Sequence, residues 1–342
     1  MDGVTKEFFA KENILKNKIA FIIPYFGKFP EYFCFWLKTA GSNNDIDFLI
    51  FTDDRRKFDY PSNVKVHYMS FAEMKDCIQG KFSFKISLEH PYKLCDFRLA
   101  YGYIFEYYLK SYDFWGHCDL DVVWGDIRRF LTDDILNNYD KILEHGHCEL
   151  YRNTDDINRR FMRDNHPFVS YKEVFSSNAS FCFDEKTSPM NRNLWKDVKC
   201  YTNNKIVVNT SFDNFSGFFK DFNSKKKGHL CWEQGVLSYR SKEYDIQDIM
   251  YAHFQYRTPP IYVDEKSDKF LLTPEGFVSK LDKRKSCRGF LFGYNIKAKK
   301  NTLRFFLYKI LFALKLKNRF KKVFIIPSYF TYKEHWKGKI VK

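Results

Sequence analysis

The chain has 342 residues, of which 44% are hydrophobic and 29% are charged. This composition excludes a disordered protein, and the length suffices for one large α/β domain with appendages or for two modest domains. The formal net charge of +15 is unevenly distributed. Residues 280–342 hold 19 Lys and Arg against two acidic residues, a net charge of +17, which leaves a net charge of −2 on residues 1–279. A basic body that wraps around nucleic acid is therefore disfavoured.

The first part of the chain predicts alternating strands and helices. Residues 18–23 form a short apolar run before Pro24, which is typical of a buried strand, and residues 46–51 and 64–69 predict two more strands. Apolar residues at helical spacing predict a helix over residues 30–40. This order of strand, helix and strand indicates a parallel, doubly wound sheet.

The following segments predict a second, less regular half. Residues 93–110 predict a long helix, and residues 112–118 predict a fourth strand that runs directly into Asp119 and Asp121. Residues 140–260 mix short strands and loops with His, Asn and aromatic residues, as expected of a substrate-facing half.

The basic C-terminal segment predicts a linker followed by an amphipathic helix. Residues 282–300 are rich in Lys and Arg, whereas residues 301–322 carry Leu, Ile and Phe on one face and Lys and Arg on another. Such a helix can lie on an anionic membrane surface. The alternative is a helix that packs on its own domain.

Cysteine usage and the N-terminus predict a cytosolic protein. The nine cysteines are odd in number and contain no C-x-x-C pair, which favours a reducing compartment over a secreted disulfide framework. Residues 1–18 lack the apolar region of a signal peptide, and no apolar run is long enough to span a membrane as a helix.

Two aspartates at the end of a predicted strand are the strongest candidates for chemistry. Asp119 and Asp121 lie two residues apart, so their carboxylates point to one face while the chain stays extended. Two convergent carboxylates can hold a hard divalent cation, and that cation can hold a diphosphate. Asp45 and Asp47 have the same spacing, but they open a strand without polar neighbours, so we interpret them as structural.

The segment around these aspartates resembles a known family. Residues 112–127 are similar to the Asp-x-Asp region of GT-A glycosyltransferases, which use nucleotide sugars, and look most like bacterial enzymes of surface-polysaccharide synthesis. The resemblance covers roughly residues 18–260. It implies a GT-A-like, Rossmann-type mixed sheet flanked by helices within a catalytic domain of residues 1–279, followed by the basic amphipathic extension, residues 280–342.

The resemblance also implies a metal site. In these families the last aspartate of the motif binds the metal and the first contacts the ribose or the metal, which implies these roles for Asp121 and Asp119. His253 matches the place of a third ligand after the last core strand, which favours a retaining enzyme, and the alternative is a buried or loop histidine. Two carboxylates and an imidazole suit Mn²⁺, with Mg²⁺ as the second choice. Arg257 is expected to neutralise the β-phosphate.

The resemblance implies a uridine diphosphate as the nucleotide, with a binding region at the ends of the first strands and on the predicted helix. An aspartate in this region would accept a hydrogen bond from the uracil N3–H, and a basic residue would bind a phosphate. The alternative for Lys93 and Asp96 is a simple surface ion pair. The residues implied in donor binding are Pro24, Tyr25, Phe26, Asp53, Asp54, Lys93, Asp96, Arg98, Asp119 and Arg257.

Three carboxylates are candidates for the catalytic group. Glu233 follows a possible strand and precedes a helix expected to start near Gly235, and the alternative is an acid that complements the helix dipole. Asp184 and Glu185 form the second candidate position.

Together these features predict a metal-dependent glycosyltransferase that transfers a sugar from a nucleotide diphosphate-sugar to a saccharide or lipid-linked saccharide. The expected location is the cytoplasmic face of the membrane, with residues 301–322 on the anionic surface. The alternatives are a Mg²⁺-dependent phosphoryl-transfer enzyme, which would need a further acidic cluster, and a protein that binds nucleic acid through its basic tail.

The basic segment of residues 280–342 allows a test between the membrane-binding and the nucleic-acid-binding hypotheses. We expect the segment 280–342 to bind vesicles of anionic lipid, because its apolar face has no use on a phosphate backbone. Salt-dependent binding to nucleic acid, without affinity for such vesicles, would instead favour the nucleic-acid reading. Vesicle flotation and a nucleic-acid titration over a salt series measure the two outcomes.

Overall fold

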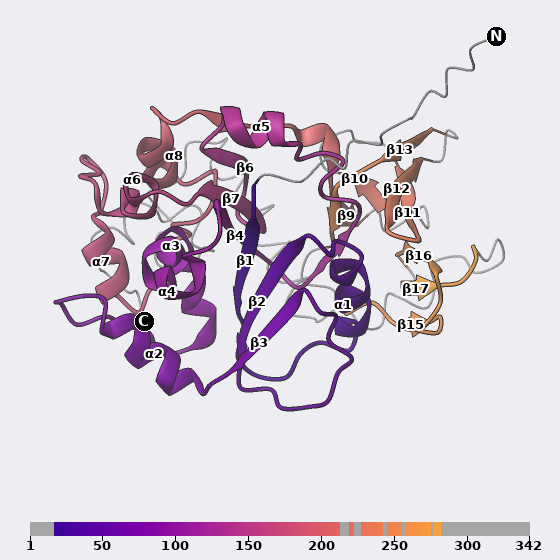
Figure 1. Cartoon of the computed structure of the whole chain (residues 1–342), viewed down its shortest axis with the longest axis horizontal. Helices are drawn as coiled ribbons and strands as arrows, with labels where there is room; N and C mark the ends of the chain where they lie inside the picture. Colours follow the sequence, from indigo (N-terminus) through magenta and orange to yellow (C-terminus); the bar gives the residue numbers. More distant parts are fainter. Residues whose placement is uncertain are drawn as a thin grey trace, which may run out of the picture.

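Two β-sheets with helices packed against them make up the described part of the chain (Figure 1). The computed structural model describes residues 17–212, 219–221, 227–241, 245–254, 258–274 and 276–281. The linker and helix expected within residues 282–342, and Arg257, lie outside the described residues.

The first sheet has seven strands in the order β3-β2-β1-β4-β7-β6-β8. Neighbours from β3 to β4 are parallel, as are β6 and β8, whereas β7 is antiparallel to both β4 and β6. The prediction of an α/β fold with a mixed sheet flanked by helices is therefore confirmed. Its strands are β1 (Ile19–Pro24), β2 (Ile46–Thr52), β3 (Val64–Tyr68), β4 (Phe114–Cys118), β6 (Lys141–His145), β7 (Cys148–Arg152) and β8 (Cys200–Tyr201).

The second sheet has ten strands, mostly antiparallel, and its path ends with β9, β14 and β5 beside the first sheet. Its strands are β5 (Val122–Trp124), β9 (Val207–Phe212), β10 (Phe219–Asp221), β11 (Lys227–Glu233), β12 (Val236–Ser241), β13 (Ile246–Asp248), β14 (Tyr251–His253), β15 (Ile261–Tyr262), β16 (Lys269–Thr273) and β17 (Gly276–Val278).

The helices are short, and three of them are 3₁₀ helices, labelled η. In chain order they are α1 (Phe33–Gly41), α2 (Phe71–Gln79), η1 (Pro91–Ala100), α3 (Tyr101–Ile104), α4 (Glu106–Leu109), α5 (Asp133–Asn138), α6 (Asp155–Asn158), η2 (Arg160–Met162), α7 (Tyr171–Ser176), α8 (Pro189–Trp195) and η3 (Asn204–Ile206). Among the described residues, none of these helices is long and apolar enough to cross a bilayer.

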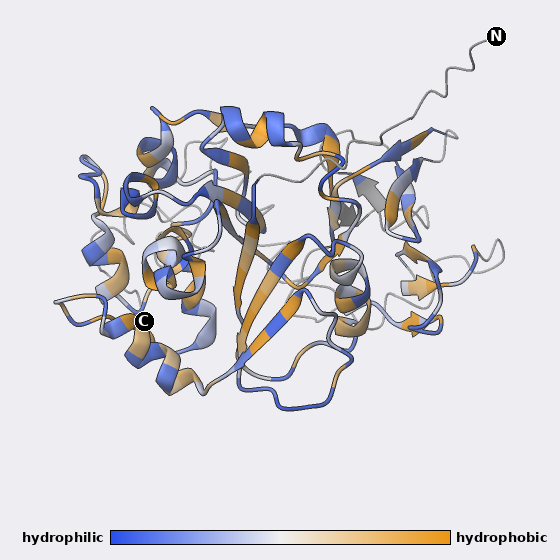
Figure 2. Cartoon of the chain, viewed as in Figure 1, coloured by the Kyte–Doolittle hydropathy of each residue, from blue (hydrophilic) through white to orange (hydrophobic). Residues whose placement is uncertain are grey.

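Both faces of the first sheet are buried, which explains the continuous apolar runs of its central strands (Figure 2). Successive side chains of a strand point to opposite faces, so Phe21 packs into one core while Ile22 packs into the other. Helix α1 covers the first of these faces with Phe33 and Trp36, and η1, α2, α3 and α7 cover the opposite face. Figure 1 shows α1 and α2–α4 on opposite sides of β1–β3.

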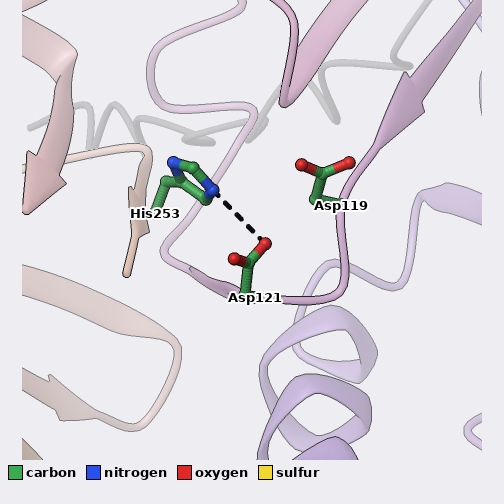
Figure 3. Close-up of side chains that lie close together, drawn as sticks. All are labelled: Asp119, Asp121 and His253. Carbon is green, nitrogen blue, oxygen red and sulfur yellow. Dashed lines mark ion pairs between the residues drawn. The ribbon is translucent and has the colours of Figure 1, made fainter. Parts of the chain in front are cut away.

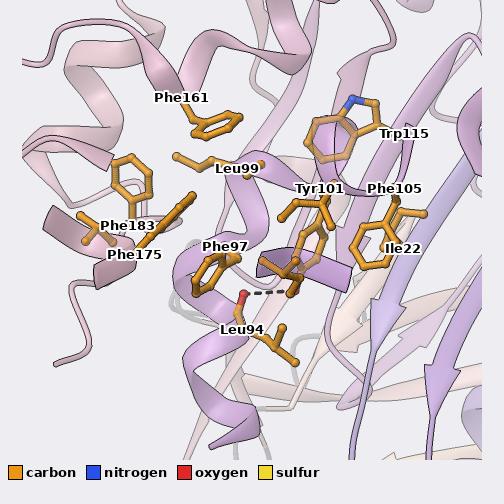
Figure 4. Packing of buried hydrophobic residues seen from close by; sticks show 14 of the residues in the cluster. Ile22, Leu94, Phe97, Leu99, Tyr101, Phe105, Trp115, Phe161, Phe175 and Phe183 are labelled. Atoms are coloured by element: carbon orange, nitrogen blue, oxygen red, sulfur yellow. Dashed lines mark hydrogen bonds between the residues drawn. The ribbon is translucent and has the colours of Figure 1, made fainter. Parts of the chain in front are cut away.

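Aromatic residues fill the core between η1 and the sheet (Figure 4). The rings of Phe97 and Phe175 stack with centroids 4.1 Å apart, and the Tyr101 hydroxyl donates to the carbonyl of Leu94 at 3.1 Å. Aromatic residues make up 20% of the chain, and many of them are therefore used for packing rather than for ligand binding.

The long helix expected over residues 93–110 is wrong, because the segment forms a 3₁₀ helix followed by two single α-helical turns. Pro91 occupies its first position. At Gly102 the chain passes so close to Trp115 that an added Cβ would lie 2.4 Å from the indole Nε1. A 3₁₀ helix places residues i and i+3 on one side, which brings Lys93 and Asp96 together.

Lys93 and Asp96 form a buried ion pair rather than a surface pair, with side chains 0% and 1% exposed and 2.8 Å between Nζ and Oδ2. The Lys93 ammonium also donates to the carbonyls of Val174 and Ala179, at 2.9 and 2.6 Å. The Asp96 carboxylate accepts from the backbone N–H groups of Phe181 and Phe183. Burial lowers the pKa of Lys93, and the charge of Asp96 opposes this shift. The hydrogen bonds of the pair attach residues 174–183 to η1.

We expect Lys93→Met to lower the free energy of unfolding by about 3–5 kcal/mol, because it leaves the Asp96 charge buried without its cation. The matched control is Lys75→Met, which breaks the more exposed ion pair with Glu89 and should cost at most about 1 kcal/mol. Urea denaturation measures both changes. Equal losses in the two variants would contradict a structural role for the buried pair.

Candidate functional site

Asp119 and Asp121 lie where the chain passes from the first sheet to the second, between the end of β4 and the start of β5. The Asp119 backbone N–H donates to the carbonyl of His147 at 3.0 Å, which fixes the first aspartate to the turn between β6 and β7. Strand β5 then pairs with β14 so that Val122 lies opposite His253. The backbone N–H of Phe254 donates to the carbonyl of Asp121 at 3.0 Å.

This register brings Asp119, Asp121 and His253 together, and their ligand atoms all lie within 4.8 Å of one another (Figure 3). His253 Nε2 lies 3.3 Å from an Asp121 carboxylate oxygen, and their side chains are 8% and 14% exposed. The other ring nitrogen, Nδ1, lies 3.2 Å from Asn209 Oδ1. If Nδ1 carries the proton donated to Asn209, two lone pairs face each other at Nε2 and Asp121, and a cation between them would relieve the repulsion.

The donor set therefore fits a divalent cation such as Mn²⁺, which accepts both carboxylate and imidazole ligands. Asn209 was not found from the sequence. It belongs to no motif, and only the register of β9 beside β14, which aligns Asn209 with His253, places it at the site.

Asp119, Asp121 and His253 form a metal-type cluster, and Arg98 connects this cluster to a second pair of acidic residues. One end of its guanidinium donates to Asp119 Oδ1, and Nη1 donates to Asp184 Oδ2 at 2.9 Å and to the carbonyl of Gly146 at 2.5 Å. The Arg98 side chain is 14% exposed. The Arg98 guanidinium thus holds together η1, the end of β4, the turn after β6 and the segment that contains Asp184.

Asp184 and Glu185 differ in their surroundings although they are neighbours in sequence. The Asp184 side chain is 4% exposed, and burial raises its pKa well above the usual range although the Arg98 charge opposes the shift. Burial also raises the pKa of Glu185, on which Arg98, Asp119 and His253 act electrostatically. The Glu185 carboxylate lies against Gly146, where an added Cβ would come within 2.9 Å of it.

Glu233 lies at the end of β11 on the second sheet, where its exposed carboxylate pairs with Lys269 at 2.7 Å. The helix expected near Gly235 is wrong. Gln234 and Gly235 have positive φ values of 48° and 87°, and they form the tight turn that connects β11 to β12. Such turns need positive φ at both central residues, which a glycine supplies without strain.

The loop that follows β1 is shaped by the two aspartates that follow β2. The Asp53 carboxylate accepts from the N–H of Gly27 at 2.7 Å, and that of Asp54 accepts from the N–H of Phe29 at 2.8 Å. A side-chain hydrogen bond from Arg56 lowers the pKa of Asp54 to about 2. Both aspartates thus contact protein groups.

Of the residues before Gly27, Pro24 ends β1, and Tyr25 stacks on Phe29 with ring centroids 5.2 Å apart. Phe26 is buried and packs against Phe71. Burial raises the pKa of Tyr25, and the charges of Asp54 and Asp121 add to the shift while that of Arg56 opposes it.

Comparison with known proteins identifies a family and a set of distant structures. The model of a family of unknown function (DUF6625) matches residues 21–281, whereas no curated protein matches the chain. The galactosyltransferase LgtC in complex with donor and acceptor sugar analogues is 14% identical, with a TM-score of 0.33 over 56% of this chain and 75% of that chain. Mouse xyloside xylosyltransferase 1 is 9% identical, with a TM-score of 0.38 over 72% of this chain and 99% of that chain.

At these TM-scores the two enzymes are too distant to assign an activity to the chain. The family model, in contrast, covers well over half of the sequence, from the first strand to the last described residue. The chain therefore belongs to the family of unknown function DUF6625.

Proposed function

We propose that the protein is a metal-dependent glycosyltransferase of the GT-A type, which transfers a sugar from a nucleotide diphosphate-sugar to a saccharide acceptor. The observation that carries the proposal is the cluster of Asp119, Asp121 and His253. It follows β4, which is parallel to β1 and β2, so it shares an edge of the sheet with the loops after those strands. Ligands of open α/β sheets bind at this edge.

Each part of the edge has a role in the proposed reaction. Asp119, Asp121 and His253 would hold a divalent cation, Mn²⁺ or Mg²⁺, which neutralises charge on the diphosphate as it leaves. Tyr25, in the loop held by Asp53 and Asp54, would border the nucleotide base, for which we propose uracil. Those two aspartates act through the loop rather than directly.

Among the three candidate carboxylates, Glu185 is our choice for the catalytic group. Asp184 is engaged by Arg98, and Glu233 is engaged by Lys269 on a hairpin of the second sheet. The charges of Arg98, Asp119 and His253 act on Glu185, whose carboxylate lies against Gly146, and Arg98 donates to the Gly146 carbonyl. There its carboxylate would stabilise the positive charge that develops at the anomeric carbon, in a reaction that we propose to proceed with retention of configuration.

Arg98 acts in this proposal as a positioning residue for Asp119 and Asp184, since its guanidinium is shared between them. The pair of Lys93 and Asp96 likewise acts on the chain segment that leads to Asp184. A β-phosphate contact by Arg257, and an anionic membrane contact by residues 301–322 at the cytoplasmic face, remain proposals that rest on the sequence alone.

No described contact supports the phosphoryl-transfer alternative. Asp126, the acidic residue nearest in sequence to the motif, is exposed and accepts from the backbone N–H of Arg129 at 3.1 Å instead of adding to the cluster. For the donor we propose a UDP-sugar, and for the acceptor a growing surface polysaccharide, either free or carried on a lipid.

We expect Asp121→Ala to abolish binding of Mn²⁺ and to remove Mn²⁺-dependent hydrolysis of UDP-sugars, because a carboxylate ligand is lost. Asp45→Ala is the matched control, since Asp45 belongs to the other Asp-x-Asp pair and contacts Arg128 at 2.7 Å. Calorimetric titration with Mn²⁺ and with UDP, followed by a hydrolysis assay over a panel of UDP-sugars, measures these effects. If the wild type binds neither ligand and Asp121→Ala changes nothing, the proposed function is lost.

We expect Glu185→Gln to lower the rate of transfer about 10²–10⁴-fold while Mn²⁺ binding stays near the wild-type value, because the charge at the reaction centre is removed but no metal ligand is. Since burial raises the pKa of Glu185, wild-type activity should fall with decreasing pH already above the ordinary range of a glutamate, and the variant should lack this limb. Glu233→Gln should retain the wild-type rate. The opposite ranking of the two variants would move the catalytic role to Glu233.

A further inference from the structure

His147 contacts two of the three residues of the metal-type cluster, although it is not a member of it. It lies in the turn between β6 and β7. Its backbone carbonyl accepts from the Asp119 N–H at 3.0 Å, and its imidazole stacks on the ring of His253 with centroids 4.0 Å apart and an interplanar angle of 23°.

Tyr251 also contacts the His147 ring. The Tyr251 hydroxyl lies 3.2 Å from His147 Nδ1, and the two rings meet edge to face with centroids 5.6 Å apart. Tyr251 and His253 are two residues apart on β14, so their side chains point to the same face of that strand. A hydroxyl can donate or accept, so this contact orients His147 in either neutral tautomer.

The ring of His253 is thereby constrained on its edges and on one face. Asn209 contacts Nδ1 and Asp121 lies at Nε2, while His147 covers a face of the ring. Rotation of His253 about its Cβ–Cγ bond, which would turn Nε2 away from Asp121, would require the His147 ring to move. Partners that orient a ligating histidine commonly change metal affinity about 10–100-fold.

We propose that His147 is a positioning residue of the metal site, which holds the His253 ring in its ligating orientation and, through its carbonyl, holds the backbone of Asp119. This inference rests on the proposed metal-dependent function, and it assigns a role to His147, a residue to which the proposed reaction gives none. His147 contributes by its aromatic face and by its contact to Tyr251, not as a ligand.

His145 supplies a matched control within the same stack. Its ring lies parallel to that of His147, with centroids 5.1 Å apart and an interplanar angle of 3°, on the strand β6 that precedes the turn. It is the same residue type, two positions earlier, and the described ring contacts connect it to His147 rather than to His253.

The test uses the full chain and Mn²⁺ alone as the probe, with affinity measured from the electron paramagnetic resonance signal of the free ion. We expect His147→Ala to weaken Mn²⁺ binding about tenfold or more. His147→Phe should restore most of the affinity, because it keeps the stacked ring, and Tyr251→Phe should cause a smaller loss than His147→Ala. His145→Ala should bind Mn²⁺ like the wild type.

A second readout reports the orientation of His253 directly. The Co²⁺ absorption spectrum depends on the ligands and geometry of the ion, so it should change in His147→Ala and return in His147→Phe. Circular dichroism and the thermal midpoint check folding. If His147→Ala does not fold, His147→Phe and Tyr251→Phe decide the question, since an unchanged affinity in Tyr251→Phe combined with a full loss in His147→Phe would exclude positioning by the ring face.

The inference is overturned if folded His147→Ala binds Mn²⁺ like the wild type, or if His145→Ala loses as much affinity as His147→Ala. Its failure differs from failure of the proposed function. If the wild type binds no Mn²⁺, both the proposed function and the role of His147 are excluded. If the wild type binds Mn²⁺ but uses no nucleotide sugar, the proposed function is excluded, and the Mn²⁺ affinities of the variants still test the role of His147.

Discussion

The site depends on the charged side chains of η1, which lie in a largely buried environment and must be compensated there. Asp96, paired with Lys93, accepts from the backbone at Phe181 and Phe183, and Arg98 pairs with Asp184 immediately afterwards. The same short helix therefore holds successive residues of one segment. Since unpaired buried charges are costly, this segment is strongly bound to η1, and Glu185 is carried to the cluster as a consequence.

The second constraint is the passage of the chain between sheets. Asp119 follows a strand of the first sheet and Asp121 precedes a strand of the second, so the two carboxylates lie at the junction. Pairing of β14 with both β5 and β9 then sets which residue stands opposite Val122 and beside Asn209. That residue is His253, so a one-residue change of register would point a different side chain toward Asp121.

The strands near the N-terminus were predictable because burial on both faces leaves an uninterrupted apolar run, as in residues 18–23 and 46–51. Grouping His253 with the two aspartates needed the resemblance, since the register of β14 leaves no local pattern. The helix over residues 93–110 was mispredicted because tertiary contacts, including the approach of Gly102 to Trp115, override its apolar periodicity. The context of Glu233 was mispredicted because Gly235 serves a hairpin turn, and a glycine marks either kind of boundary.

The two aspartates of the motif are not equivalent, and the difference follows from Arg98. One carboxylate oxygen of Asp119 accepts from the guanidinium, which also serves Asp184, so part of the Asp119 charge is compensated by the protein. A carboxylate oxygen of Asp121 lies close to the imidazole of His253, and these two ligand types can bind the same cation. Asp119 is therefore linked through Arg98 to the segment that carries Glu185, whereas Asp121 faces the imidazole of His253 on the second sheet.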